Sequence, residues 1–303
     1  MRILLTGANG FIGGRLLLVL AREHEVTALV RRAPAHPVPG VGYAAQDLTA
    51  PLDPDRLPSA VDAVIHQAAL IDADSAAADA DPFLVNVVAT QRLLDYAGRA
   101  GARIVVHAST GGVYGCSEHP FTEDAPFSPM DRYSLTKAQA ELAVTASSYT
   151  VPQRAYATVI LRYFFPYGVG TPNPIPRYVA AAVRGEPIAL PEGGGPRFNP
   201  LHIDDAVAAT LAALHLDSDS VLNIAGTELT TFGEIATFAA ARSGRTLQIT
   251  TLPAADVIPY YRSALVADIT RMTTQLGFTP RIPLTTGLAE LTDHYRSRTE
   301  AAA

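Results

Sequence analysis

Tyr133 and Lys137 give the clearest chemical signal in the sequence. They stand four residues apart in a segment whose pattern predicts a helix up to about Tyr149, so their side chains share one helical face. A free tyrosine has a pKa of about 10, which is too high for proton transfer at neutral pH. A cation one helical turn away favours the phenolate and lowers that pKa. The spacing therefore predicts a tyrosine that works as a general acid and base.

The choice of lysine at residue 137 supports this chemistry. The 23 basic residues of the chain comprise 22 arginines and one lysine. An arginine could also lower the pKa of a tyrosine, but lysine adds a compact ammonium that can bridge to ribose hydroxyls. Tyrosine and lysine at this spacing also occur by chance, so their interpretation depends on the segments that must position them.

Two hydroxyl residues follow a predicted strand. Residues 103–107 have the apolar, β-branched pattern of a strand, and Ser109 and Thr110 come shortly after its end. In doubly wound sheets, ligands bind outside the carboxyl ends of the strands. We therefore expect both hydroxyls to face the ligand cleft.

The first predicted strand, residues 3–6, runs into a turn with three spaced glycines, and an apolar helical segment at residues 15–21 follows. One glycine allows the tight bend, one lets the backbone approach a pyrophosphate, and one lets the helix pack on the strand. The helix N-terminus then stabilises the anion. Spaced glycines also occur in ordinary turns, but this context predicts a dinucleotide, whose oxidised nicotinamide ring would lower the Tyr133 pKa further. The expected contacts are Gly7, Asn9, Gly10, Phe11, Ile12 and Gly13.

The end of the second predicted strand, residues 25–30, bears on the choice of cofactor. An acidic residue there would bond the ribose hydroxyls of NAD, whereas an arginine accommodates the 2′-phosphate of NADP. Arg31 and Arg32 stand at this end, without an acid. We expect NADP, with NAD as the alternative if both arginines are simply solvated.

The order of the remaining elements predicts an α/β fold with a doubly wound parallel sheet of the Rossmann type. Further strands are expected near residue 43 and at residues 61–69, 158–162, 221–224 and 247–251, the strand at 221–224 within the main sheet. Helices are expected at residues 82–98, from an opening segment at 174–178, and at 231–241, 268–276 and 285–298. We expect a dinucleotide-binding domain over residues 1–165, with returning segments near 200–225. A smaller C-terminal α/β substrate domain, interleaved with it, is expected over residues 166–303.

Composition bears on localisation and on the classes of partner. The formal net charge of −6 argues against nucleic acid, which usually requires a basic face. The only cysteine is Cys116, so no disulfide can form within the chain, and no apolar run reaches the roughly 18–20 residues of a membrane span. These features predict a cytoplasmic protein with a small-molecule substrate and no membrane partner. No metal is expected, because His66 has no partner at ligand spacing.

Together these segments resemble the extended short-chain dehydrogenase/reductases and, more narrowly, the NAD-dependent epimerase/dehydratase family. Most members of that family act on nucleotide sugars. The resemblance rests on the glycine turn, Asp47-Leu48, His66-Gln67-Ala68-Ala69, Asn86, Ser109-Thr110, Val113-Tyr114-Gly115 and the segment from Tyr133 to Lys137.

The resemblance implies a catalytic trio of Thr110, Tyr133 and Lys137. Tyr133 would be the general acid and base, Thr110 would hydrogen-bond the substrate oxygen, and Lys137 would hold the nicotinamide ribose and tune Tyr133. Homodimers would form through helices near residues 84–98 and 130–149. The other predicted cofactor contacts are Asp47 and Leu48, which would flank the adenine, and Gln67, Ala68, Ala69, Asn86, Ser109 and Phe164. The predicted substrate contacts are Val113, Tyr114, Phe165, Arg177 and Arg197.

The second half departs from the family pattern on the substrate side. The family usually has asparagine at the position of Phe165 and commonly has arginine at that of Phe198, whereas Arg197 of this chain lies one residue early. A second diphosphate-binding arginine, expected near residues 252–256, is missing, and the nearest arginine is Arg262.

Gly111 and Gly112 stand where a sugar dehydratase of the family needs carboxylates, so dehydration ranks last among the family's reactions. We predict an NAD(P)-dependent oxidoreductase that reduces a ketone or epimerises a hydroxyl on a nucleotide sugar or a similar hydroxylated metabolite. The arginines after the second strand favour net reduction. Two alternatives are a carbonyl reductase for a smaller, non-nucleotide substrate and a non-catalytic cofactor-sensing protein.

Overall fold

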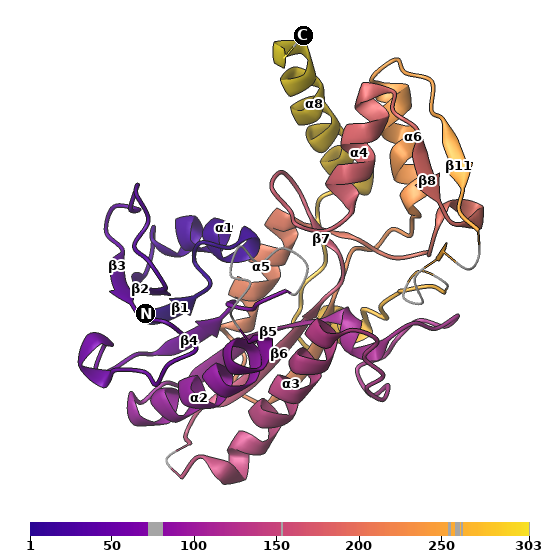
Figure 1. Cartoon of the computed structure of the whole chain (residues 1–303). Helices are drawn as coiled ribbons and strands as arrows, with labels where there is room; N and C mark the ends of the chain where they lie inside the picture. Colours follow the sequence, from indigo (N-terminus) through magenta and orange to yellow (C-terminus); the bar gives the residue numbers. More distant parts are fainter. Residues whose placement is uncertain (72–80, 153, 254–255, 258–260, 262, 303) are drawn as a thin grey trace. The chain divides into compact units, whose positions relative to one another are not determined.

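The computed structural model describes residues 1–71, 81–152, 154–253, 256–257, 261 and 263–302. The chain forms two compact units, each assembled from segments that are separate in sequence (Figure 1). The first unit comprises Met1–Val113, Pro129–Arg162 and Val207–Leu222, and the second comprises Tyr114–Ser128, Tyr163–Ala206 and Asn223–Ala303.

A seven-stranded sheet has the strand order β10-β6-β5-β4-β1-β2-β3. The pairs β3–β2, β2–β1, β1–β4 and β4–β5 are parallel. This order confirms the predicted doubly wound sheet. The strands are β1 (Arg2–Thr6), β2 (Glu25–Val30), β3 (Gly42–Ala45), β4 (Ala63–His66), β5 (Ile104–Thr110), β6 (Ala157–Tyr163) and β10 (Ser220–Ile224).

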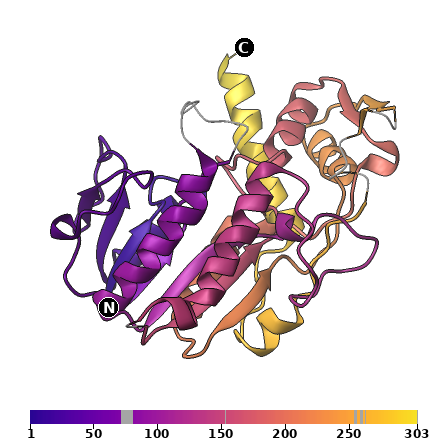
Figure 2. The ribbon, with the colours of Figure 1, turned by 60° about the horizontal axis from the view of Figure 1, so that its bottom comes forward.

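The first unit carries most of the helices that flank this sheet. Figure 2 shows α2 and α3 side by side across one face of the sheet, where they also contact each other. These helices are α1 (Phe11–Leu20), a π-helical turn (Leu84–Val88) that continues into α2 (Ala89–Arg99), and α3 (Arg132–Thr150), with 3-10 turns at Pro54–Arg56 and Gly111–Tyr114. A further helix, α5 (Ile203–Ala213), begins in residues of the second unit and continues into the first.

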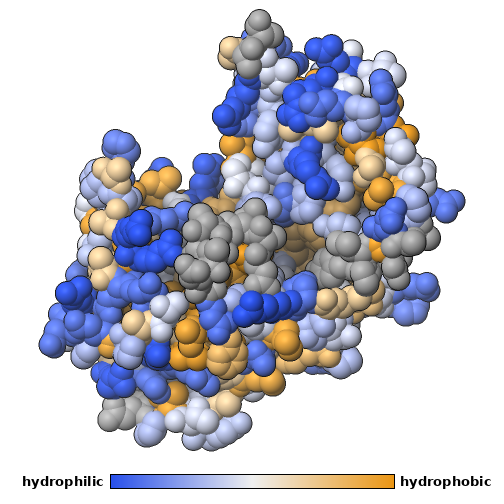
Figure 3. Space-filling model, viewed as in Figure 1, coloured by the Kyte–Doolittle hydropathy of each residue, from blue (hydrophilic) through white to orange (hydrophobic). Residues whose placement is uncertain are grey.

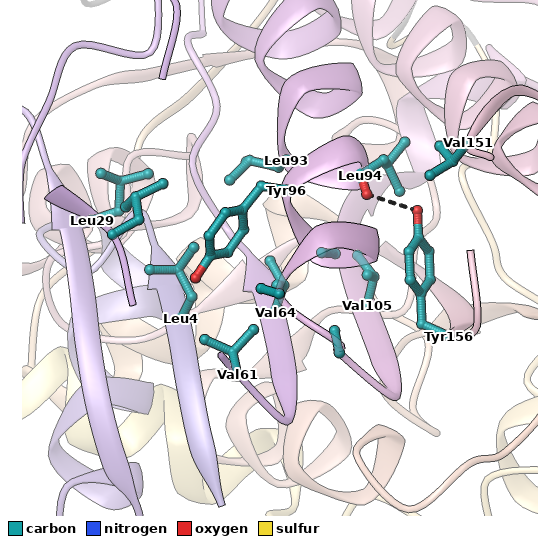
Figure 4. Close-up of a cluster of buried hydrophobic side chains, with 14 of the residues drawn as sticks. Leu4, Leu29, Val61, Val64, Leu93, Leu94, Tyr96, Val105, Val151 and Tyr156 are labelled. Atoms are coloured by element: carbon teal, nitrogen blue, oxygen red, sulfur yellow. Dashed lines mark hydrogen bonds between the residues drawn. The ribbon is translucent and has the colours of Figure 1, made fainter. Parts of the chain in front are cut away.

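A hydrophobic core lies between the sheet and α2 and α3 (Figure 4). Leu4, Val64 and Val105 stand opposite one another on β1, β4 and β5 and are buried. Leu94 of α2 packs into the same cluster, and the hydroxyl of Tyr156 donates a hydrogen bond to its carbonyl oxygen at 3.0 Å. Burying one such aliphatic side chain stabilises the fold by about 1.5–3 kcal/mol, so this face fixes the strand register.

Two boundaries in the first unit differ from the predicted ones in ways that affect the site. Helix α1 begins at Phe11 rather than at residue 15. Gly10 is its N-cap residue, and Gly13 adopts the helical conformation within its first turn. Strand β5 continues to Thr110, so Ser109 and Thr110 are its last two residues rather than residues that follow it. Threonine is β-branched and suits a strand, which explains the extension.

The second unit holds three packed helices, since α4 contacts both α6 and α8. Thr231 caps α6 by accepting from the amide of Glu234, whose carboxylate accepts from the amide of Thr231, and this capping box fixes the predicted start of the helix. Helix α7 is shorter than the predicted residues 268–276. The elements are β7 (Pro166–Tyr167), α4 (Ile175–Arg184), β8 (Ile188–Leu190), a 3-10 turn (Glu192–Gly194), β9 (Leu201–His202), α6 (Phe232–Arg242), β11 (Ile249–Thr251), α7 (Thr270–Thr274) and α8 (Leu284–Ala302).

Across the described residues, no helix combines the length and the apolar character that crossing a membrane requires.

Candidate active site

The glycine turn joins β1 to α1 through a backbone that leaves no room for side chains. Gly7 has a φ of +73°, and a Cβ there would lie 2.5 Å from the amide nitrogen of Ala68. A Cβ on Gly13 would lie 2.1 Å from the carbonyl oxygen of Gly7. Helix α1 starts after Gly10 without a capping side chain among the described residues. The first N–H groups of α1 therefore point toward a potential anion site.

A pocket of about 380 Å³ opens beside this turn, within the first unit. It lies next to the boundary between β1 and β4, where the strand order reverses. Open α/β sheets bind ligands at this kind of switch point. The pocket is lined by Gly7, Ala8, Asn9, Gly10, Leu29, Val30, Arg31, Arg32, Gln46, Asp47, Leu48, Thr49, Gln67, Ala68, Ala69, Leu70 and Val85.

Charged side chains line one end of the pocket. Arg31 and Arg32 directly follow β2 and are exposed. The Asp47 carboxylate accepts hydrogen bonds from the amide and the hydroxyl of Thr49, both at 2.9 Å. These bonds, and the nearby charge of Arg31, lower the pKa of Asp47. The carboxylate thus stays ionised and turned toward its own loop.

The three predicted catalytic residues all belong to the first unit. Asp131 caps α3 by accepting from the amide of Ser134 at 2.7 Å, which places Tyr133 in the first turn and Lys137 in the second. Thr110 ends β5, and its hydroxyl oxygen accepts the amide of Gly112 at 3.1 Å, so the hydroxyl proton is left for another acceptor.

Burial is the main cause of the pKa shifts of Tyr133 and Lys137. It raises the pKa of the Tyr133 phenol well above its ordinary value, and the negative charge of Asp131 adds to the shift. It lowers the pKa of Lys137, which is only 1% exposed, to about 8, against the opposing effect of the Glu141 carboxylate. The expected lowering of the tyrosine pKa is therefore not found in the protein alone, because desolvation and the charge of Asp131 both raise this pKa. A bound cation would have to reverse the shift.

A row of polar side chains crosses three strands beneath the trio. Thr6, His66 and His107 stand opposite one another on β1, β4 and β5, two residues beyond the apolar row of the core and on the same face. All three are buried. The rings of the two histidines lie 5.3 Å apart. The strand register thus brings together side chains from positions 60 and 41 residues apart in sequence.

The hydrogen bonds of His66 determine its tautomer. The hydroxyl of Thr90 donates to the carbonyl oxygen of Asn86 at 2.7 Å, so it must accept from His66 Nε2, 3.0 Å away. His66 Nδ1 then accepts from the Thr6 hydroxyl at 2.7 Å, and the Thr6 oxygen accepts the amide of Ala68 at 3.1 Å. His66 is neutral and fully bonded, and burial lowers its pKa to about 3.

His107 and Ser109 connect β5 to the catalytic helix. His107 Nε2 lies 3.2 Å from the Nζ of Lys137. The Ser109 hydroxyl donates to the carboxylate of Glu141, one turn after Lys137, and Arg162 binds the same carboxylate through a contact of 2.6 Å. This ion pair is buried. The Ser109 hydroxyl proton is therefore taken up by Glu141, whereas the Thr110 hydroxyl accepts the amide of Gly112 and keeps its proton for another acceptor.

Two predicted substrate residues are buried. Val113 is fully enclosed in the first unit. In the second unit, the Tyr114 ring stacks on Phe121 with centroids 4.8 Å apart, and its hydroxyl donates to Asn223 at 2.8 Å. Neither side chain is open to a ligand in this structure.

Phe165 is the described non-glycine residue with a positive φ, +42°. Its partly exposed ring lies 4.5 Å from the ring of Phe198, which packs 4.7 Å from Phe232. Phe198 and Phe232 are fully buried. Arg177 and Arg197 are exposed in the same unit, and the Arg177 guanidinium lies 5.0 Å from the centre of the Tyr178 ring. Phe198, at the position where the family commonly has an arginine, is therefore part of an aromatic core.

A model of the NAD-dependent epimerase/dehydratase family matches residues 3–225. The chain belongs to this family. The match spans the glycine turn, the polar row and the catalytic trio, and it confirms the family predicted from the sequence.

Individual known proteins are similar to this chain over different parts of its length. A dTDP-glucose 4,6-dehydratase of Mycolicibacterium smegmatis is 32% identical over 68% of this chain, and the alignment covers 66% of that enzyme, just under two thirds. A 3-diazoavenalumate denitrifying reductase of a Streptomyces species is 34% identical over 75% of this chain and 77% of its own length. A solved structure, MoeE5 in complex with UDP-glucuronic acid and NAD, is 30% identical, covers 99% of this chain and 100% of its own, and gives a TM-score of 0.82.

Ten of the residues predicted to bind the cofactor line the pocket beside the glycine turn. These residues are Gly7, Asn9, Gly10, Arg31, Arg32, Asp47, Leu48, Gln67, Ala68 and Ala69. The other predicted cofactor residues do not line it. Phe11, Ile12 and Gly13 form the start of α1, and Ser109, Tyr133 and Lys137 lie at β5 and α3.

Asn86 and Phe164 are placed differently from what was predicted. The Asn86 side chain accepts from the amide of Leu70 at 2.8 Å and donates to the Leu70 carbonyl at 3.0 Å and to Thr136 at 2.9 Å. The Asn86 side chain therefore links the loop after β4 to α3 through hydrogen bonds. Phe164 is buried in the second unit, with its amide bonded to Ile224. Arg262 lies outside the described residues.

Sequence reasoning missed several residues near the predicted site, among them Thr49, Gln46 and His107. Thr49 and Gln46 line the pocket. The Asp-x-Thr spacing of residues 47–49 is a turn signal that could have indicated Thr49. His107 gave no local signal, because its contact with Lys137 depends on the packing of β5 against α3. In the described part of the chain, no group of three or more His, Cys, Asp or Glu side chains is placed to hold a metal ion.

Proposed function

We propose that this protein is an NAD(P)-dependent oxidoreductase that reduces a ketone or epimerises a hydroxyl on a nucleotide sugar or a similarly hydroxylated metabolite. One observation carries the proposal: Thr110 ends β5, and Tyr133 and Lys137 lie in the first two turns of α3, which packs against β5 in the unit that also holds the glycine-turn pocket. Side chains for proton transfer and a site for the redox cofactor thus belong to one folded unit.

The glycine turn fits a dinucleotide. A Cβ at Gly7 or Gly13 would fill the space in which the backbone approaches its neighbours, and the N-terminus of α1 favours a pyrophosphate. When bound, the nicotinamide supplies a hydride for reduction or accepts one for oxidation. The contacts would come from the turn, from Arg31 and Arg32, and from Lys137 on the ribose hydroxyls.

The protein residues handle the proton. In reduction, Tyr133 donates its phenolic proton to the carbonyl oxygen as the carbon receives the hydride, so the ketone gains one hydride and one proton. Thr110 donates a hydrogen bond to the same oxygen. Lys137 stabilises the phenolate that remains, which counters the raised pKa of Tyr133. Oxidation runs through the same groups in reverse, and epimerisation combines the two directions.

Two glycines argue against sugar dehydration. Gly111 and Gly112 begin the 3-10 turn that follows Thr110. They have no side chain with which to take up or release a proton during removal of water. Oxidoreduction and epimerisation need only the trio and the cofactor, so these reactions are favoured.

NADP is the cofactor that we propose within the NAD-dependent family. Arg31 and Arg32 are exposed and line the pocket at the end of β2, where a 2′-phosphate would lie. Guanidinium groups bind phosphate through paired, charge-assisted hydrogen bonds. Among the described residues that line the pocket, the carboxylate is that of Asp47, which accepts hydrogen bonds from Thr49 of its own loop.

A carbonyl reductase for a smaller, non-nucleotide substrate is the second candidate. The buried ring of Phe198 stands in place of the family arginine, and Phe165 adds an aromatic surface beside it. Neither side chain can pair with a diphosphate. The similarity to a 3-diazoavenalumate denitrifying reductase of a Streptomyces species, whose name includes no nucleotide sugar, supports this candidate.

We also propose a homodimer that forms through α3. Leu135, Leu142 and Tyr149 are 47%, 59% and 81% exposed and stand seven residues apart, so they lie on one side of the helix. Phe83, just before the π-helical turn of α2, is 43% exposed. In Figure 3, apolar side chains lie among polar ones over the region of α2 and α3. Exposed apolar residues in such a row are typical of protein interfaces.

Thermal unfolding with added ligands tests the function. NADPH should raise the midpoint more than NADH does, and UDP-glucose, UDP-glucuronic acid or dTDP-glucose should raise it further in the presence of cofactor. If no nucleotide sugar stabilises the protein but NADPH oxidation occurs with simple ketones, the smaller-substrate candidate is correct. Cofactor binding without turnover on any carbonyl compound would indicate a sensor instead.

A further inference from the structure

His107 is the side chain that contacts the ammonium of Lys137. Its Nε2 lies 3.2 Å from Nζ, and both side chains are buried. Among the described residues, this is the hydrogen bond that Lys137 makes. The neighbouring His66 has the same burial and lies opposite His107 on β4, yet both of its nitrogens bond to threonine hydroxyls. The two histidines therefore have different roles.

The chemistry of the pair fixes the state of His107. An ammonium has donors and no acceptor, so Nε2 must carry a lone pair and the imidazole must be neutral. Protonating His107 would remove that acceptor and bring two cations to within 3.2 Å. The histidine therefore serves the lysine only as a neutral acceptor.

We propose that His107 is a positioning residue for Lys137. It accepts one N–H of the ammonium and so fixes Nζ beside the end of β5, leaving the other two N–H bonds for the cofactor ribose and for support of the Tyr133 phenolate. The effect of this contact on catalysis rests on the proposed function, whereas the contact between His107 and Lys137 does not depend on it.

Charged and titratable groups reach this pair from several elements. Tyr133 and Glu141 lie one turn before and one turn after Lys137 on α3, His66 lies on β4, and Arg162 on β6 neutralises Glu141. Burial and the Lys137 charge both lower the pKa of His107 far below its ordinary range, which agrees with a neutral acceptor. Because Glu141 is already paired with Arg162, His107 is the polar contact that is free to hold the ammonium in place.

The single lysine makes a direct test possible. Protein labelled with ¹³Cε-lysine gives one lysine resonance, so the titration of Lys137 can be followed by NMR without assignment. His107→Phe keeps a ring but removes the acceptor, whereas His107→Gln places an amide oxygen at a similar reach. We expect the Lys137 pKa to fall by about one unit in H107F, because the charged form loses its partner, and to stay near the wild-type value in H107Q.

His66→Gln is the matched control, since it alters a buried histidine of the same row without removing the acceptor of Lys137. It should leave the Lys137 titration unchanged. If H107F fails to fold, His107→Met takes its place as an apolar variant. An unchanged Lys137 pKa in the apolar variant would overturn the proposal. An equal fall of the Lys137 pKa in H107F and H107Q would also overturn the proposal. It would mean that an acceptor at residue 107 does not restore the Lys137 pKa.

Kinetics separates positioning from general stability. In alcohol oxidation, H107F should lower kcat about 10- to 100-fold, leave the KM for the alcohol nearly unchanged, and shift the pH–rate profile to higher pH, because phenolate formation loses support. H107Q should recover most of the activity. A wild-type pH profile in H107F would overturn the positioning role. If the wild-type protein turns over no carbonyl compound, the proposed function fails, while the NMR titration still decides the contact.

Discussion

Gly13 lies so close to Gly7 that a Cβ on Gly13 would be 2.1 Å from the carbonyl oxygen of Gly7. The first turn of α1 is thus packed directly on the backbone of the phosphate turn. The geometry of the turn and the position of the helix N-terminus therefore depend on each other. A change in either one should alter cofactor binding.

Gly13→Ala should test this coupling. The added methyl group must push α1 away from the turn, so we expect a stability loss of about 1–3 kcal/mol and a cofactor affinity at least about tenfold lower. Urea unfolding and fluorescence titration with NADPH measure both quantities. Gly42→Ala is the control, because a Cβ there meets its nearest neighbour at an ordinary 3.5 Å. Normal cofactor binding by G13A would contradict the packing argument.

Tyr133→Phe should remove the proton donor while keeping the ring. We expect kcat for carbonyl reduction to fall about 10²–10⁴-fold, the usual contribution of general acid catalysis. The Kd for NADPH should stay within about threefold of the wild-type value, because the phenol acts on the substrate oxygen. Undiminished turnover in this variant would exclude the assigned role.

Replacing Arg31 and Arg32 together by alanine should change the choice of cofactor. Charge-assisted hydrogen bonds contribute about 1.5–3 kcal/mol, so the KM for NADPH should rise roughly 10- to 100-fold while that for NADH changes little. Arg22→Ala, at an exposed arginine outside the pocket, is the matched control. An equal effect on both cofactors would show that the arginines do not read the 2′-phosphate.

The buried histidine His66 should make the fold sensitive to acid. Its pKa is about 3 in the native state and near 6.5 in the unfolded chain, so between these values the unfolded chain binds a proton that the native state does not. The stability contribution is complete above pH 6.5 and is lost as the pH falls toward 3, by up to about 1.4 kcal/mol per pH unit.

His66→Gln removes this titration and keeps a polar side chain. Urea unfolding at pH 7, 6 and 5 should show a smaller loss of stability with acid in H66Q than in the wild type. His107 shifts in the same direction and remains in both proteins, so some acid sensitivity should persist. Identical pH slopes would mean that His66 is not held neutral in the native state.

Leu142→Arg should weaken the proposed homodimer. An arginine in the middle of the row on α3 would place a charge in an apolar interface, so light scattering after size exclusion should detect a larger monomer fraction. Leu18→Arg is the control, because Leu18 of α1 is 47% exposed, as Leu135 is, but lies outside that row. A wild-type protein that is monomeric at all accessible concentrations would rule the interface out.

Local patterns were sufficient to predict the main sheet. The alternation and β-branching of residues 25–30 match β2 residue for residue, and the small residues after β4 pointed to the pocket. The strands β7, β8 and β9, which are two or three residues long, were missed. So few residues cannot show the alternation of apolar and polar side chains by which a strand is predicted. The π-helical turn at Leu84–Val88 was also missed, since its pattern resembles that of an α-helix.

The parts of the site that sequence reasoning missed depend on long-range packing. His66 and His107 become neighbours only through the parallel register of β4 and β5, which no local signal encodes. The direction of the Tyr133 pKa shift depends on burial, and burial depends on everything packed around α3. Phe198 could be seen as a departure from the family, but its place in an aromatic core required the fold.

The buried ammonium of Lys137 also makes it possible to measure local opening of the structure around it. Lysine-directed acylating reagents need a neutral, accessible ε-amine, and this chain has one ε-amine, which is 1% exposed. Its modification therefore requires a local opening around Lys137, and the acylation rate measures how often that opening occurs, much as amide hydrogen exchange does. Mass spectrometry of the peptide that contains Lys137 would then measure the frequency of this opening and how far a bound cofactor lowers it.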